Sequence, residues 1–268
     1  MKKQIQIALL ALAMSPLMAW AQQTFSTPDQ AASALVDAVS HQNNAELDKL
    51  FGENWQQFLP PDGVDPDAVA RFLRDWQLGH RIVMLNNTAW LDVGHDSWRL
   101  PIPMEKGDKG WAFNIAAGED EILTRAIGRN ELSAIEAMHA YVDAQEDYYQ
   151  LNHAWAQKII SSEGKKDGLY WPIKPGENPS PLGPNFSPAV PGEGYHGYHF
   201  RIIADGDKGE VALLAWPVEW GQTGVMSFMV DKTDRVYEAN LGAETAQKAQ
   251  AITQFSPDSS VGWQAAAE

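Results

Sequence analysis

Residues 119–160 read EDEILTRAIGRNELSAIEAMHAYVDAQEDYYQLNHAWAQKII and contain the longest helical pattern in the chain. Large, mostly apolar side chains recur there at alternating spacings of three and four residues, at Ile135, Met138, Val142, Gln145 and Tyr149. This spacing places them on one side of an α-helix. We interpret that side as core-facing, with packing against a partner helix as the alternative.

Gly128 interrupts the pattern near its start. Glycine weakens helices, so we expect a break there, with a short helix before it and a main helix that begins at Glu131. Asn130 would be the N-cap of this main helix. The break also sets the predicted boundary between an N-terminal domain, residues 24–127, and a second domain, residues 128–245.

After this helix, residues 161–195 have no helix or strand periodicity, and thirteen of these 35 residues are Gly or Pro. A loop of this length is uncommon in a compact domain. Its aromatic block, Leu169-Tyr170-Trp171-Pro172, needs a surface to pack on. We therefore expect the loop to wrap over the surface of the second domain.

The chain after residue 197 is typical of an antiparallel sheet. Segments 198–204 and 210–216 flank a Gly- and Asp-rich turn, and segments 225–231 and 236–238 flank a second turn. A long helix followed by a small sheet predicts an α+β domain. Residues 246–268 are polar, and we expect a loose tail there.

The N-terminal half predicts helices followed by a meander. Thr27-Pro28-Asp29 is a typical helix start. Two further helices and four short strands are expected at 46–51, 65–79, 81–85, 89–93, 98–102 and 110–115. This order is typical of α+β proteins, and it loosely resembles the cone-shaped fold of nuclear transport factor two. The predicted fold class is thus α+β, with two domains.

Residues 1–21 have the three-part layout of a secretory signal. Lys2 and Lys3 precede an apolar run, and Ala19-Trp20-Ala21 supplies small residues for a signal peptidase. The run is short for a membrane span of about 20 residues; an uncleaved anchor is the alternative. We expect cleavage near Ala21, a periplasmic or secreted protein, and no stable membrane insertion after the signal is removed.

Charge and composition exclude several classes of function. The formal net charge of −15 repels phosphate backbones and anionic lipids, which argues against nucleic acid or bare membrane as a partner. The chain has no cysteine, and therefore no disulfide, thiolate zinc site or cysteine nucleophile.

No motif of a reaction centre is present in the sequence, and we predict no catalytic residue, cofactor or metal ligand. His196 and His199 are an odd number of residues apart and would face opposite sides of a strand. The turn around Asp205 resembles part of a calcium loop, but Trp216 stands where the bidentate acid is required. Aromatic side chains are the better functional signal, and we predict an interaction surface formed by Tyr170, Trp171, Trp216 and Trp220.

Eight stretches, spread over most of the chain after residue 21, resemble a family of secreted bacterial proteins catalogued as a domain of unknown function (number twenty-nine fifty). They are 122–132 (ILTRAIGRNEL), 141–145 (YVDAQ), 166–172 (KDGLYWP), 180–184 (SPLGP), 197–202 (GYHFRI), 215–217 (AWP), 224–228 (GVMSF) and 236–237 (VY). The resemblance implies family membership and no catalytic residue.

A second, partial resemblance concerns the C-terminal half. Residues 130–135 and 141–148 resemble the helix that enters the globular head of type IV pilins and pseudopilins, and residues 197–237 are similar to the sheet on that helix. Pilins have a long apolar helix directly before this head, whereas this chain has a polar α+β segment there. The resemblance therefore implies a pilin-like head and not fibre assembly.

Together these observations predict a non-catalytic exported envelope protein that binds another envelope protein or assists an assembly. A small-ligand binder that uses the N-terminal cone is the alternative. A periplasmic hydrolase with dispersed acids and histidines is the third hypothesis.

Overall fold

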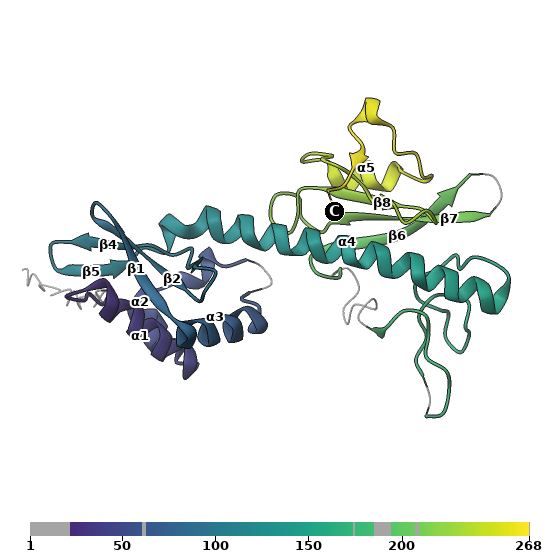
Figure 1. Ribbon diagram of the computed structural model, residues 1–268. Helices are drawn as coiled ribbons and strands as arrows, with labels where there is room; N and C mark the ends of the chain where they lie inside the picture. The colour runs from purple at the N-terminus through teal and green to yellow at the C-terminus, as the bar shows by residue number, and fades with distance from the viewer. Residues whose placement is uncertain (1–21, 61–62, 174, 185–193, 207–208, 268) are drawn as a thin grey trace, which may run out of the picture. The chain divides into compact units, whose positions relative to one another are not determined.

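The computed structural model describes residues 22–60, 63–173, 175–184, 194–206 and 209–267 (Figure 1). The predicted signal peptide, residues 1–21, lies outside the described residues. The chain separates into two compact units, Met1–Trp55 with Leu73–Ile115, and Gln56–Phe72 with Ala116–Glu268. The predicted division into domains at residue 127 stays a prediction.

The first unit contains the expected helices and meander. Its elements are α1 (Pro28–Ser40), α2 (Asn44–Phe51), the 3-10 turn η1 (Trp55–Phe58, shared with the second unit), α3 (Pro66–Leu78, in this unit from Leu73 onward), β1 (His80–Leu85), β2 (Thr88–Val93), β3 (Trp98–Arg99), β4 (Met104–Gly107) and β5 (Gly110–Phe113). The antiparallel sheet has the order β1-β2-β4-β5, and β3 pairs with β2. Helix α1 begins as predicted, because Thr27 Oγ1 accepts a hydrogen bond from the Gln30 amide.

The second unit is built on α4 (Glu119–Asn152), which follows the short turn η2 (Ala116–Gly118). The helix continues through Gly128, so the predicted break is wrong. One helical glycine costs about 1 kcal/mol, and burial of the stripe that includes Met138 and Tyr141 outweighs this cost. Asn130 is not an N-cap; its side chain donates to Thr223 O at 3.0 Å.

A five-stranded antiparallel sheet accompanies α4, in the order β10-β9-β8-β7-β6. Its strands are β6 (Tyr198–Asp205), β7 (Glu210–Pro217), β8 (Ser227–Val230), β9 (Tyr237–Ala239) and β10 (Gln264–Ala265). The two predicted hairpins, β6–β7 and β8–β9, are confirmed. Figure 1 shows α4 along one face of the sheet and α5 (Thr245–Ala251) on the other.

Strand β7 explains how both faces are covered. Leu213 and Ala215 belong to the α4 core, whereas Ala212 and Leu214 belong to the core under α5. Neighbouring side chains of a strand point to opposite faces. A strand buried on both faces therefore reads as a continuous apolar run, which here is residues 211–215.

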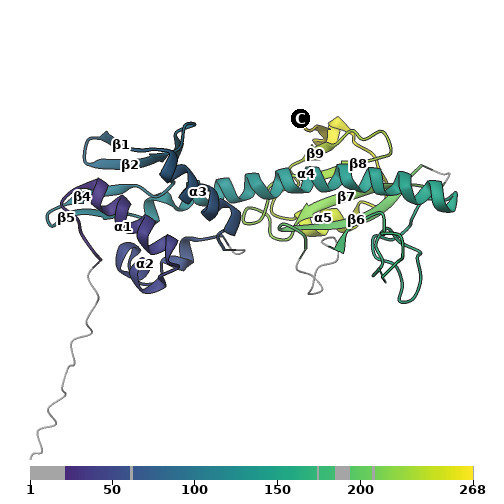
Figure 2. The same ribbon diagram turned by 60° about the horizontal axis from the view of Figure 1, so that its bottom comes forward.

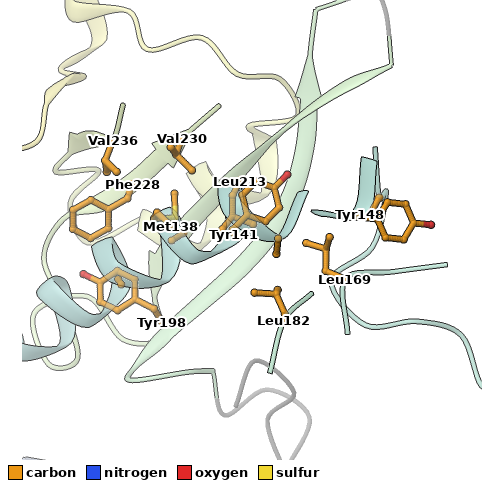
Figure 3. Close-up of a cluster of buried hydrophobic side chains, with 14 of the residues drawn as sticks. Met138, Tyr141, Tyr148, Leu169, Leu182, Tyr198, Leu213, Phe228, Val230 and Val236 are labelled. Carbon is orange, nitrogen blue, oxygen red and sulfur yellow. The ribbon is translucent and has the colours of Figure 1, made fainter. Parts of the chain in front are cut away.

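The segment after α4 enters the core instead of wrapping over the surface. Leu169, Trp171 and Leu182 are buried in the same cluster as Met138 and Tyr141, and Figure 3 shows Leu169 and Leu182 beside the helix. The apolar block of the loop thus fills core volume that the helix and sheet leave open. Residues 174 and 185–193 of the predicted loop lie outside the described residues.

The predicted loose tail is also wrong. Helix α5, the turn η4 (Ser259–Val261) and β10 occupy residues 245–265. Ala249 and Trp263 are buried in the core on the α5 face. Strand β10 pairs with β9. Buried side chains together with backbone hydrogen bonds to β9 and to Ala204 of β6 thus order this polar segment.

Candidate functional site

A groove of about 570 Å³ lies beside β6, the last strand of the sheet in Figure 2. One wall is the segment 157–160 that follows α4, and Ala246 and Gln250 of α5 lie on the other side. Five consecutive residues of β6, 198–202, line the groove together with Trp216 and Val218, and their side chains alternate between the two faces of the strand. All of these residues belong to the second unit.

Trp216 lies at the centre of an aromatic and cationic cluster in this groove. It pairs with His199 in the β6–β7 ladder, and the two ring centroids are 5.4 Å apart. The Arg201 Cζ lies 5.6 Å from the centre of the Trp216 ring. His199 and Arg201 are two residues apart and share a face of the strand, so the hairpin register places all three side chains together.

Arg201 is held in place by the last turn of α5. Its Nη2 group donates to Ala249 O at 2.6 Å and to Ile252 O at 2.7 Å. A cation at the carboxyl end of a helix satisfies carbonyl groups that have no partner within the helix. These bonds and the Trp216 ring fix the guanidinium at the groove.

The groove carries positive charge in an acidic chain. Its described lining residues include Lys158 and Arg201 and neither Asp nor Glu. Lys158 Nζ pairs with Asp167 at 2.9 Å, so its charge is balanced. Burial lowers the pKa of the His199 imidazole, which is therefore neutral at pH 7. Arg201 thus supplies the net charge of the cluster.

The outer wall is fixed by a short network around Asp167. Its carboxylate accepts from Lys158 Nζ, from the Ser162 amide at 2.7 Å and from Ser162 Oγ at 3.0 Å. The Lys158 ammonium and the Ser162 donors hold the pKa of Asp167 well below its usual range. The Tyr170 amide donates to Ile159 O at 2.8 Å. This support leaves Ile160 45% exposed at the groove.

The structure distributes the four predicted interaction residues over different environments. Trp216 is the centre of the groove, and Tyr170 supports its outer wall through the backbone. Trp171 is only 6% exposed and lies in the core, so it offers no surface. Trp220 is exposed but lies outside the described lining, with its Nε1 donating to Asn240 Oδ1 at 3.1 Å.

Sequence reasoning did not find His199 and Arg201 as groove residues. The spacing of His199 from His196 argues only about metal binding, and Arg201 belongs to no motif. The useful signal was the predicted hairpin itself, because its register places Trp216 opposite His199. Among the described residues, no group of three His, Asp or Glu side chains is arranged to hold a metal ion.

The fold is of the predicted α+β class, with helices and antiparallel sheets, and it carries an aromatic, cationic groove at a sheet edge. Over residues 22–265 the chain matches the family model described as Protein of unknown function (DUF2950), and it belongs to that family. Neither the curated proteins nor the solved structures give a match. The membership predicted from the eight stretches is confirmed; the likeness to pilin heads stays a prediction.

Within the described residues, no helix combines the length and the apolar character that crossing a membrane requires.

Proposed function

We propose that this chain is an exported, non-catalytic envelope protein that binds a segment of another protein in the groove beside β6. The observation that carries the proposal is the groove itself, with Trp216 at its centre and Ile160 exposed on its wall. Aromatic and apolar linings with a few fixed polar groups are typical of binding sites.

The residues behind the groove support a binding role because they are rigidly held. Tyr198 is fully buried under α4, and its hydroxyl donates to Met226 O at 2.8 Å. The neighbouring strand β7 is buried on both faces. A binding surface on a fixed strand loses little conformational entropy when a ligand arrives.

The described lining offers no acid–base pair for hydrolysis. His199 faces Trp216 and no carboxylate lines the groove among its described residues. A general base needs a group that orients it, and a carboxylate is the usual one. Binding therefore explains these residues better than catalysis. Export and a role in an envelope assembly follow from the predicted signal peptide and the pilin-like pattern of residues 130–237.

Site-specific photo-crosslinking in producing cells tests the proposal. A benzophenone amino acid is placed at Ile160 in the groove or at Ile173, which is 49% exposed and lies outside the described lining. We expect a protein adduct at position 160 that is absent at position 173, and that mass spectrometry identifies one partner. Equal adducts at both positions, or none at position 160, would contradict the proposal.

Trp216→Phe and Trp220→Ala provide the matched controls for that experiment. Trp216→Phe keeps a ring over Arg201, so the adduct at position 160 should persist, whereas Trp216→Ala should abolish it. Trp220→Ala should leave it unchanged, because Trp220 lies outside the described lining of the groove. A loss of the adduct in Trp220→Ala but not in Trp216→Ala would place the surface elsewhere.

A further inference from the structure

We propose that Arg201 is an anion-binding residue of the groove and that the bound protein segment presents an Asp or Glu side chain to it. This inference rests on the proposed function and names the chemistry of the partner. It begins from the hydrogen bonds of one guanidinium group.

A guanidinium has five N–H donors in a fixed plane. In Arg201, only the Nη2 group is used, for the carbonyl oxygens of Ala249 and Ile252. The Nε and Nη1 donors have no hydrogen-bond partner among the described residues, and no described carboxylate lies within ion-pair distance of Arg201. Three of the five donors are therefore oriented and available.

The surroundings raise the affinity of this group for an anion. Arg201 is partly buried against Trp216, so water screens its charge less than at an open surface. The chain has 35 acidic and 20 basic residues, yet neither Asp nor Glu is among the described lining of the groove. Glu210 lines an adjoining cavity with Arg201, but it pairs with Lys232, so Arg201 has no ion-pair partner among the described residues. Such a cation is complementary to a carboxylate from outside.

The groove also fixes which kind of acidic ligand fits. Apolar and aromatic side chains, Ile160, Val218 and Trp216, lie in the same lining as Arg201. A ligand must therefore cover apolar surface and supply one negative group. An extended protein segment in which apolar residues flank a single Asp or Glu satisfies both requirements.

The test uses an array of ten-residue peptides, each with one Glu between varied apolar residues and each with a mate that carries Gln instead. The whole chain from residue 22 is applied as wild type, Arg201→Gln, Arg201→Lys and Arg235→Gln. Arg235 is the matched control, because its Cζ also lies over a ring, 5.4 Å from Tyr237, and it is outside the described groove lining.

We expect the wild type to bind Glu peptides roughly tenfold more tightly than their Gln mates, since charge-assisted hydrogen bonds are stronger than neutral ones. Arg201→Gln should reduce this ratio to about one, Arg201→Lys should retain part of it, and Arg235→Gln should not change it. A purely structural role of Arg201 would weaken Glu and Gln peptides equally and leave the ratio unchanged, which would overturn the inference.

The failure of this inference is distinguishable from that of the proposed function. If peptides bind, Trp216→Ala abolishes their binding and no Glu preference exists, the anion inference is wrong and the groove function stands. If no peptide binds the wild type, or if Trp216→Ala and Ile160→Glu leave peptide binding unchanged, the anion inference and the proposed function of the groove are both wrong.

Discussion

Gln145 joins the end of α4 to the wall of the groove, and replacing it by leucine should cost about 3 kcal/mol. The side chain is 3% exposed. Its Oε1 accepts from the Ala156 amide at 2.9 Å, and its Nε2 donates to Ala156 O at 2.9 Å and to Tyr141 Oη at 3.0 Å. Ala156 is buried and directly precedes the groove wall, residues 157–160.

The magnitude follows from the groups that Gln145→Leu leaves without partners. Leucine preserves the volume but satisfies neither the amide nor the carbonyl of Ala156, and each unsatisfied buried group costs about 1–3 kcal/mol. Partial relaxation brings the sum to about 3 kcal/mol, which in a chain of this size lowers Tm by about 6–12 °C.

Thermal unfolding followed by near-ultraviolet circular dichroism measures this loss. Gln150→Leu is the matched control, because Gln150 is an exposed residue of the same helix; it should change Tm by less than about 2 °C. If Gln145→Leu lowers Tm no more than Gln150→Leu does, the hydrogen bonds to Ala156 do not hold the segment and the reasoning is refuted.

Three further predictions concern other parts of the molecule. In the first unit, Arg99 and Arg81 lower the pKa of buried Asp92. Asp92 therefore stabilises the fold above the unfolded-state pKa of about 3.9, and this contribution is lost as pH falls through the lower folded-state pKa. Asp92→Asn should cost about 2–3 kcal/mol in urea unfolding at pH 7 and less at pH 3, and an equal cost at both would contradict this. Trp263→Ala should cost about 3–5 kcal/mol by thermal unfolding, whereas a loose C-terminal segment would show no change. Glu131 Oε1 accepts hydrogen bonds from the amides of Val225 and Met226, both at 2.9 Å. Glu131→Leu should speed hydrogen exchange at both amides at least tenfold, whereas Glu131→Gln should speed it much less. Equal exchange rates in the two variants would show that these hydrogen bonds do not protect the amides.

Local patterns predicted the elements well where they acted alone. The N-cap of α1 and the two hairpins of the second sheet follow from a few adjacent residues, Thr27-Pro28 and the predicted turns at 205–209 and 232–235. Such signals need no knowledge of the tertiary structure. They are the parts of the fold that the sequence determines most directly.

The errors have a common physical cause, which is burial against distant residues. Gly128 weakens α4 locally, but the helix is held by the sheet 70 or more residues later. Trp263 is a single tryptophan in a polar segment, and its importance is visible only once Ala249 and Met229 surround it. Local propensity predicts neither the uninterrupted helix α4 nor the burial of Trp263.

The candidate site was predictable only in its aromatic centre. Trp216 was expected as a surface residue because of its type and its position near the sheet. Arg201 and His199 join it through the β6–β7 register, which a sequence pattern suggests but does not fix. The carbonyl partners of Arg201 come from α5, a helix absent from the expected elements.

Helix α5 is much shorter than the strand that it covers. Seven residues of α-helix span about 10 Å, whereas the eight residues of β7 span about 27 Å. Ala212, Leu214 and Trp216 all point to the α5 face, and the first two are fully buried, whereas Trp216 is only partly so. The helix thus covers part of that face and leaves the end that carries Trp216, where the base of the groove and Arg201 are found. This end of the face offers the Trp216 ring and the oriented Arg201 guanidinium to a partner.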